Sequence, residues 1–293
     1  MFHVIARVSI SLLLLFSPLL WANPSPTPNP NHVRYNLSDK YIDAKQSYFI
    51  DLLRLAMEKS EQQYGDFELQ AVAIDMTQRR AIKFVQEFEL DVVWTMTTME
   101  RELQLKPIYF PLLKGLLGYR IAVIRSEDAD KFNDIRSLEE LQRIPVGQGL
   151  DWPDSDILQK QGFTLVRGAD HNLLTMLNKK RFDYYLRGLH EPWSELIDQP
   201  GLMIEPNFVI IYPAPIYFFV RQDNELLAER LEYGLRAALA DGSFDSLFYS
   251  HAITHGVLER VNLPTRQEFR IDNPFLSDSS KNLLSERQLW FEK

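Results

Sequence analysis

The alternation of strand-like and helix-like segments constrains the fold of this chain more than any other feature. In the segment 48–65, apolar residues recur at helical spacing from Phe49 to Met57, and Gly65 can end the helix. Strands are predicted at 32–37, 67–74, 90–96, 119–125, 144–149, 163–169 and 182–188, and helices at 48–65, 76–89, 170–181 and 224–240. Segments that alternate in this way form mostly parallel sheets with helices on both faces. The sequence therefore predicts an α/β fold.

The order of these segments also predicts two nested lobes. One series of strands and helices runs from residue 32 to about 122, and a second occupies 123–214. Residues 202–222 hold two strand-like runs broken by Pro213 and Pro215, and the chain then adds helices and a possible strand, EFRI, with no obvious new sheet. We therefore expect residues 215–293 to return and complete the first lobe. The first lobe is then 32–122 plus 215–293, and the second is 123–214. Two crossings between the lobes form a hinge beside a ligand cleft.

The N-terminal residues have the pattern of an export signal. Arg7 precedes an apolar run from Val8 to Leu20, which is shorter than the roughly 20 residues that span a bilayer. We expect residues 1–22 to be a signal peptide that is cleaved after Ala22, which places the protein in the periplasm. The alternative is an uncleaved amphipathic anchor. Residues 23–31 alternate proline with polar residues and are predicted to be a disordered leader.

Composition excludes several classes of function. The net charge is −8 and no basic block is present, which argues against nucleic acid as a partner. The chain has no cysteine, which excludes disulfides, thiol catalysis and cysteine metal sites. No later apolar run is long enough to span a membrane, so we expect a soluble protein, acting as a monomer and without a cofactor.

A series of short motifs carries a resemblance to a known family. In order, they are SYFIDLLRLA (47–56), FELDVVWTM (88–96), TMER (98–101), GYRIAVIR (118–125), DIRSLEELQRIPVGQG (134–149) and MLNKKRFDYYL (176–186). Their order and spacing resemble periplasmic solute-binding proteins of the polar amino-acid ABC transporter type, solute-binding protein family 3, from about residue 32 to 252. The resemblance implies a two-lobed periplasmic-binding-protein type II fold with an interlobe cleft and a hinge. It also implies a small-molecule ligand, a membrane permease as partner, and no catalysis.

The resemblance places two ligand contacts on the first lobe. The carboxylate-binding arginine of the family falls on Arg101, whose guanidinium offers the two-pronged donor fork that suits a carboxylate. A family hydroxyl contact falls on Thr98. The alternative for Arg101 is a solvated helix-end residue that pairs with Glu100 or Glu102.

A second cluster of candidate contacts follows a predicted strand of the second lobe. The segment GQGLDWPDSDIL (147–158) opens a helix near Pro153, and backbone N–H groups at such a helix start attract anions. Family members place a ligand contact on this turn. Trp152 is a candidate for stacking on the ligand and Asp151 for a polar contact. The alternatives are that Trp152 belongs to the core and that Asp151 caps the helix.

The end of the strand 182–188 departs from the family pattern. In amino-acid binders an aspartate here accepts the α-ammonium of the ligand, but by count from Asp183 that position falls on Gly188. Arg187 and Glu191 flank it, and we expect both to contact the ligand. A cation in this place disfavours an amino-acid zwitterion. The chain therefore resembles a divergent branch, and we expect an anionic or amino-acid-like solute.

Two other classes of function stay open. His190 beside Glu191 has the form of a general acid–base pair, so an enzyme similar to periplasmic dehydratases is one alternative. The other is a sensory module that signals to a membrane sensor. His251 and His255 share a helix face, but Ala252 stands where a zinc protease needs glutamate, so no metal site is expected.

Overall fold

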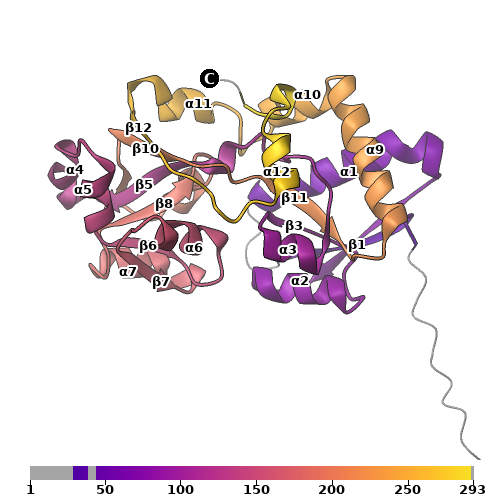
Figure 1. Ribbon diagram of the computed structural model, residues 1–293, viewed down its shortest axis with the longest axis horizontal. Helices are drawn as coiled ribbons and strands as arrows, with labels where there is room; N and C mark the ends of the chain where they lie inside the picture. The colour runs from indigo at the N-terminus through magenta and orange to yellow at the C-terminus, as the bar shows by residue number, and fades with distance from the viewer. Residues whose placement is uncertain (1–28, 39–43, 292–293) are drawn as a thin grey trace, which may run out of the picture.

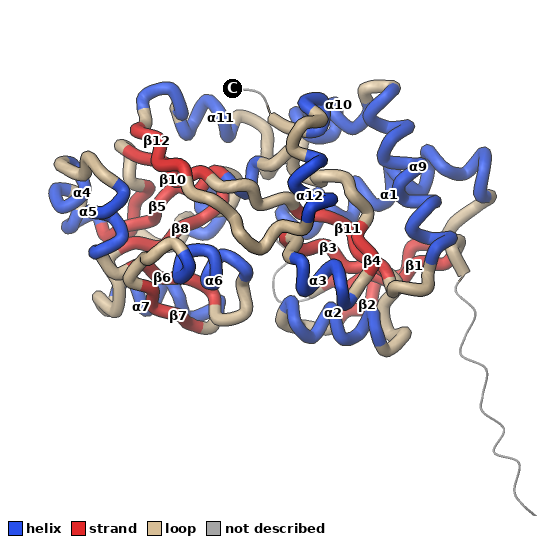
Figure 2. Tube along the Cα trace, viewed as in Figure 1, coloured by secondary structure: helices blue, strands red, loops and turns tan. Residues whose placement is uncertain are grey.

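The computed structural model describes residues 29–38 and 44–291, and its strands form two separate sheets (Figure 1, Figure 2). The signal peptide predicted for residues 1–22 and most of the predicted leader lie outside the described residues. Within the part that is described, no helix has the length and apolar character needed to cross a bilayer.

The first sheet has five strands in the order β2-β1-β3-β11-β4. Its strands are β1 (His32–Leu37), β2 (Glu68–Ala73), β3 (Val92–Met96), β4 (Lys106–Pro107) and β11 (Ile216–Val220). Its helices are α1 (Ala44–Tyr64), α2 (Gln78–Gln86), α3 (Met99–Gln104), α9 (Glu225–Ala240) and α10 (Ser243–Ser250). β1 pairs parallel with β2 and β3, whereas β11 is antiparallel to β3 and β4. Figure 1 shows α1 and α9 on one side of this sheet and α2 and α3 on the other.

The second sheet has seven strands in the order β12-β10-β5-β8-β6-β7, with β9 paired to β5. Its strands are β5 (Tyr119–Arg125), β6 (Val146–Gly149), β7 (Leu165–Gly168), β8 (Tyr184–Gly188), β9 (Leu202–Ile204), β10 (Phe208–Ile211) and β12 (Gln267–Arg270). Its helices are α4 (Asp130–Asn133), α5 (Leu138–Arg143), α6 (Pro153–Lys160), α7 (Leu173–Asn178) and α8 (Pro192–Glu195). β8, β6 and β7 are parallel, and β5 runs antiparallel to β8.

The C-terminal segment differs from its predicted course. We expected all of 215–293 to complete the first lobe, but β12 pairs residue for residue with β10 in the second sheet. The physical reason is that β10 would otherwise be the edge strand of that sheet, with unpaired backbone groups. β5 also lies wholly in the second sheet, which therefore begins at Tyr119 rather than at 123. The other lobe boundaries stay predictions.

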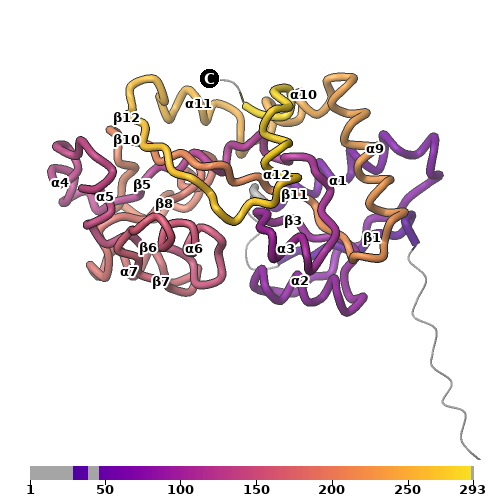
Figure 3. The backbone as a smooth tube through the Cα atoms, in the orientation of Figure 1, coloured from indigo at the N-terminus to yellow at the C-terminus, as the bar shows by residue number. Residues whose placement is uncertain are grey.

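The chain then returns to the first lobe. Figure 3 shows the segment after β12 running back to α12 (Asp278–Leu283), and α11 (Val257–Val261) precedes β12 on the outward path. The Ser280 hydroxyl of α12 donates to Oε1 of Glu102 in α3, at 2.8 Å. Midway, Nδ2 of Asn273 donates to the carbonyl oxygen of Pro213, at 2.8 Å. The C-terminal strap, defined here as residues 271–291, thus connects the two lobes beside the hinge.

The hinge segments touch at their backbones. The amide of Tyr212 donates to the carbonyl oxygen of Gly118 at 3.0 Å. A Cβ atom at Gly118 would lie 2.1 Å from the carbonyl oxygen of Tyr212, so only glycine permits this approach. The chain therefore passes between the two sheets just before β5 and just after β10, and these two passages are in contact.

Candidate functional site

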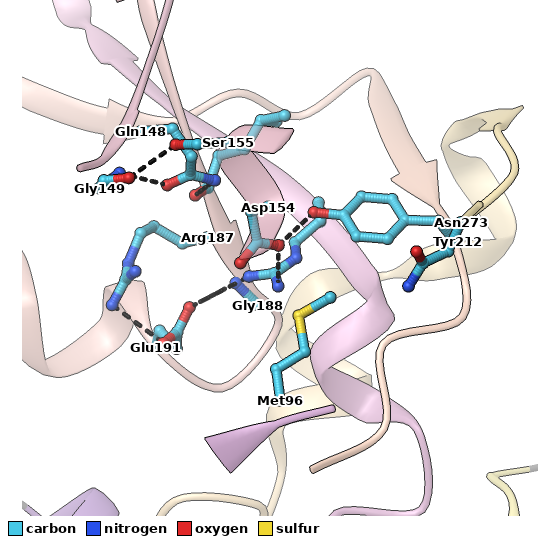
Figure 4. Close-up of polar contacts among 12 residues, drawn as sticks. Met96, Gln148, Gly149, Asp154, Ser155, Arg187, Gly188, Glu191, Tyr212 and Asn273 are labelled. Carbon is cyan, nitrogen blue, oxygen red and sulfur yellow. Dashed lines mark hydrogen bonds and ion pairs between the residues drawn. The ribbon is translucent and has the colours of Figure 1, made fainter. Parts of the chain in front are cut away.

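A buried acid at the start of α6 joins the hinge to the second lobe. Asp154 accepts hydrogen bonds at Oδ1 from the Tyr212 hydroxyl and from Nη2 of Arg120 (Figure 4). Arg120 is 1% exposed, and Tyr212 is equally buried. Burial raises the pKa of the Tyr212 hydroxyl well above its ordinary value, which keeps it protonated as the donor. Three segments that are distant in sequence therefore meet at one carboxylate.

The ion pairs continue from Arg120 into the second lobe. Nη1 of Arg120 lies 3.6 Å from Oε2 of Glu191, and Nη2 of Arg187 lies 3.0 Å from Oε1 of Glu191. Arg187 also donates to both carboxylate oxygens of Glu195, at 2.9 and 2.5 Å. Burial alone lowers the pKa of Arg187, but the two glutamates outweigh it and raise that pKa above its ordinary value. Buried charges are tolerated when they are paired in this manner.

Glu191 fills the space beside Gly188. The amide of Gly188 donates to Oε2 of Glu191 at 2.7 Å, and a Cβ atom at Gly188 would lie 3.3 Å from the same oxygen. The sequence count shows no carboxylate at Gly188. The turn after β8 nevertheless returns a carboxylate to that place, where Arg120 and Arg187 already neutralise it.

Trp152 packs on its own lobe. Its ring stacks on Tyr185 with centroids 6.4 Å apart, and the Arg187 guanidinium lies 4.9 Å from the Trp152 ring centroid. A Cβ atom at Gly149 would lie 2.3 Å from the indole, so the ring also lies against the glycine turn. Trp152 therefore covers the buried Arg187, as the core interpretation of this residue expects.

Arg101 is held at the edge of the first lobe by α3. Thr98 is the N-cap of this helix, and its hydroxyl accepts from the amide of Arg101 at 3.1 Å. Nη1 of Arg101 donates to the Thr95 hydroxyl at 2.5 Å and to the carbonyl oxygen of Met96 at 2.9 Å. Nη2 donates to Oε1 of Gln78 at 3.0 Å. These bonds fix the plane of the guanidinium.

Arg101 forms no ion pair with a side chain of the described residues. Arg101 is 9% exposed, yet no carboxylate of residues 29–38 or 44–291 lies within 4.0 Å of it. Glu102 instead accepts from the hydroxyls of Thr97, Tyr109 and Ser280, so the alternative pairing of Arg101 with Glu102 is wrong. Burial lowers the pKa of Arg101 to about 10, which leaves it a cation at neutral pH.

Asp151 contacts the first lobe through two groups. Its carbonyl oxygen accepts from Nη2 of Arg101 at 3.3 Å, and its carboxylate accepts from Nη2 of Arg79 at 2.7 Å. Arg79 lies on α2, and Asp151 follows β6 of the second sheet. One residue of the second lobe therefore meets two cations of the first lobe across the cleft.

The six sequence-predicted site residues fall into two groups. Arg101, Thr98 and Asp151 meet where the lobes face each other. In the second lobe, Arg187 contacts both Trp152 and Glu191. Sequence reasoning did not select the partners Gln78, Arg79, Arg120, Asp154 and Tyr212. One signal was available, because Arg120 is a charged residue inside the strand YRIAVIR, ahead of the apolar run Ile121–Ile124. Among the described residues, no group of three or more His, Cys, Asp or Glu is arranged to hold a metal ion.

Solved structures of binding proteins share the fold of this chain. An ancestral arginine-binding protein with bound arginine is 19% identical, with a TM-score of 0.57 over 76% of this chain and 98% of its own. A periplasmic binding protein of Salmonella typhimurium with high arginine specificity is 17% identical, with a TM-score of 0.55 over 74% and 97%. A histidine kinase sensor domain similar to periplasmic binding proteins is 16% identical, with a TM-score of 0.57 over 76% and 98%.

These likenesses establish the fold. No family model matches the sequence, and no curated protein matches it. At a sequence identity of 16 to 19%, a structural likeness shows the fold of a protein but not which ligand it binds. The predicted two-lobed periplasmic-binding-protein fold is confirmed.

Proposed function

We propose that this protein binds a small anionic solute between its two lobes, and that Arg101 holds the carboxylate of that solute. The observation that carries the proposal is the buried guanidinium of Arg101, which no carboxylate neutralises among the described residues. An unpaired buried cation is unfavourable by several kcal/mol, and a bound anion removes that penalty. Thr95 and Met96 hold Nη1 in place, and Gln78 and Asp151 accept from Nη2. A ligand carboxylate would therefore bind at the remaining Nε–H group or replace one of these neutral acceptors.

Closure of the lobes would couple binding to a change of shape. Asp151 of the second lobe contacts Arg101 and Arg79 of the first, so these contacts form only when the lobes approach. A ligand on Arg101 that also contacts the second lobe binds the closed arrangement better than the open one. Such differential affinity shifts the population toward the closed form.

The partner of the closed form has two candidate identities, a membrane permease and a membrane sensor. Structures similar to this chain include an amino acid ABC transporter substrate-binding protein of Streptococcus pneumoniae and a histidine kinase sensor domain, both at a TM-score of 0.57. We favour an exported, monomeric protein that acts in the periplasm after removal of residues 1–22.

Catalytic turnover plays no part in this proposal. Loss of a detected turnover in the His190→Ala variant would instead support the dehydratase-like alternative.

A thermal-shift screen tests the binding proposal. Residues 23–293 are screened against organic acids, amino acids and amines, since a ligand at about 100 times its Kd stabilises the native state by about 2.7 kcal/mol. The ligand should no longer raise the melting temperature of Arg101→Met. It should still raise that of Arg54→Met, a substitution at an exposed position of α1. A shift that survives in Arg101→Met places the site elsewhere. The absence of any hit favours a role in protein contacts.

A further inference from the structure

The carboxylates around Arg101 are already paired with other arginines. Four acids act most strongly on the charge of Arg101, namely Asp154, Glu100, Asp151 and Asp156. Three of them have an arginine partner: Asp154 has Arg120, Asp151 has Arg79 at 2.7 Å, and Asp156 has Arg167 at 2.8 Å. The fourth, Glu100, is exposed to water and accepts from Gln104 at 3.1 Å.

The same holds deeper in the second lobe. Glu191 lies within ion-pair distance of both Arg120 and Arg187, at 3.6 and 3.0 Å. Glu195 accepts two hydrogen bonds from Arg187. Figure 4 shows Asp154 and Glu191 in one cluster, with Met96 of the first lobe beside it. Among the described residues of this cluster, Asp154, Glu191 and Glu195 each have an arginine partner already, so none of these three acids is left to pair with a further cation.

This arrangement treats the two charges of a zwitterion unequally. A ligand carboxylate would meet the unneutralised guanidinium of Arg101. At Asp154 or Glu191, a ligand ammonium would have to displace an arginine from a buried ion pair. Separation of a buried charge pair costs a factor of 30 or more in affinity, about 2–5 kcal/mol. Like charges placed side by side in the cleft weaken binding further.

We propose that the solute held by Arg101 carries a carboxylate and no ammonium group, which makes it an organic acid rather than an amino acid. This inference rests on the proposed function and adds the chemical class of the ligand. The arginines Arg120 and Arg187 determine that class, because they neutralise Asp154 and Glu191.

Matched pairs of ligands test the inference on the wild-type protein. Titration calorimetry compares glutarate with L-glutamate, 3-phenylpropanoate with L-phenylalanine, and 4-methylpentanoate with L-leucine. Within any pair that binds, the acid without ammonium should have a Kd at least about tenfold lower. Tighter binding of the amino acid overturns this inference and leaves the proposed function intact. Absence of binding by any member, up to millimolar concentration, overturns both.

A variant supplies the reverse test. Arg120→Met leaves Asp154 and Glu191 without one of their cations, so the preference should move toward the amino acid by about tenfold or more. Circular dichroism first establishes that the variant folds, and if it does not, the wild-type comparison decides alone. Arg54→Met is the matched control and should leave the preference unchanged. A folded Arg120→Met variant with the wild-type preference contradicts the role of Arg120.

Discussion

Nη2 of Arg101 in the first lobe lies 3.3 Å from the carbonyl oxygen of Asp151 in the second. Asp151 also pairs through its carboxylate with Arg79, so a single residue gathers two cations across the cleft. A carbonyl oxygen solvates a guanidinium but does not neutralise it. The contact between the lobes therefore leaves the charge of Arg101 available to an anion.

The Arg79–Asp151 pair should contribute little to binding. The Arg79 side chain is 80% exposed, and exposed ion pairs contribute about 0–1 kcal/mol. Arg79→Ala should therefore weaken ligand affinity by less than about fivefold, and the difference should shrink at high salt because exposed charges are screened. Titration calorimetry at low and high ionic strength measures both effects. A loss above about thirtyfold would show that the pair drives closure.

Asp154 should be far more important for stability than its neighbour Asp156. Asp154→Ala leaves Arg120 buried without its closest carboxylate, and breaking a buried pair typically destabilises by about 3–5 kcal/mol. Asp156→Ala, two residues further along the same helix and 59% exposed, should cost less than about 1 kcal/mol. Urea unfolding measures both free energies. Equal losses in the two variants would contradict the role of the buried cluster.

Glu205 should make stability depend on pH. Burial raises the pKa of Glu205 above its ordinary value, although the amides of Asn207 and Phe208 bond to its carboxylate. In the pH window just above the ordinary glutamate pKa, the folded protein then holds a proton that the unfolded chain has lost. Stability must therefore fall as pH rises through that window. The unfolding free energy of the wild type minus that of Glu205→Gln should therefore decrease as pH rises through this window. A difference that stays constant across the window would contradict this.

Asn273 ties the C-terminal strap to the hinge. Its Nδ2 donates to the carbonyl oxygen of Pro213 at 2.8 Å, and its Oδ1 accepts from the amide of Phe275 at 3.0 Å. Asn273→Ala should lower the unfolding free energy by about 1–3 kcal/mol, because two partly buried backbone groups lose their partner. Asn282→Ala, at an exposed position of α12, serves as the control. Thermal unfolding compares the two variants. A melting temperature of Asn273→Ala equal to that of the wild type would mean that Asn273 does not stabilise the strap against the hinge.

Local pattern predicted a large part of the fold. The strand 119–125 and a helix start at Pro153 match β5 and α6, because hydrophobic runs and proline act over a few residues. The resemblance also singled out Arg101 and Thr98, which form one capped helix. Whether these two residues contact a ligand remains a prediction.

Contacts between distant segments could not be predicted in the same way. The pairing of β12 with β10 joins Phe208 to Gln267, and nothing in either strand specifies that partner. Asp154 likewise bonds to Arg120 and Tyr212, which lie in distant segments of the sequence that come together only in the folded chain. The count that pointed to Gly188 named Glu191 only as a flanking residue, because a turn and not the strand returns its carboxylate to Gly188.

The distance between the lobes, measured with and without ligand, tests the central claim most directly. Because the chain has no cysteine, Leu103→Cys and Leu150→Cys introduce the only two sites for spin labels, at exposed positions near Arg101 and Asp151. The organic acid that stabilises the protein most should shorten and narrow the distance distribution, and the same labels on Arg101→Met should show no response. An unchanged distribution in the labelled protein, or an equal response in Arg101→Met, would contradict closure on an anion held by Arg101.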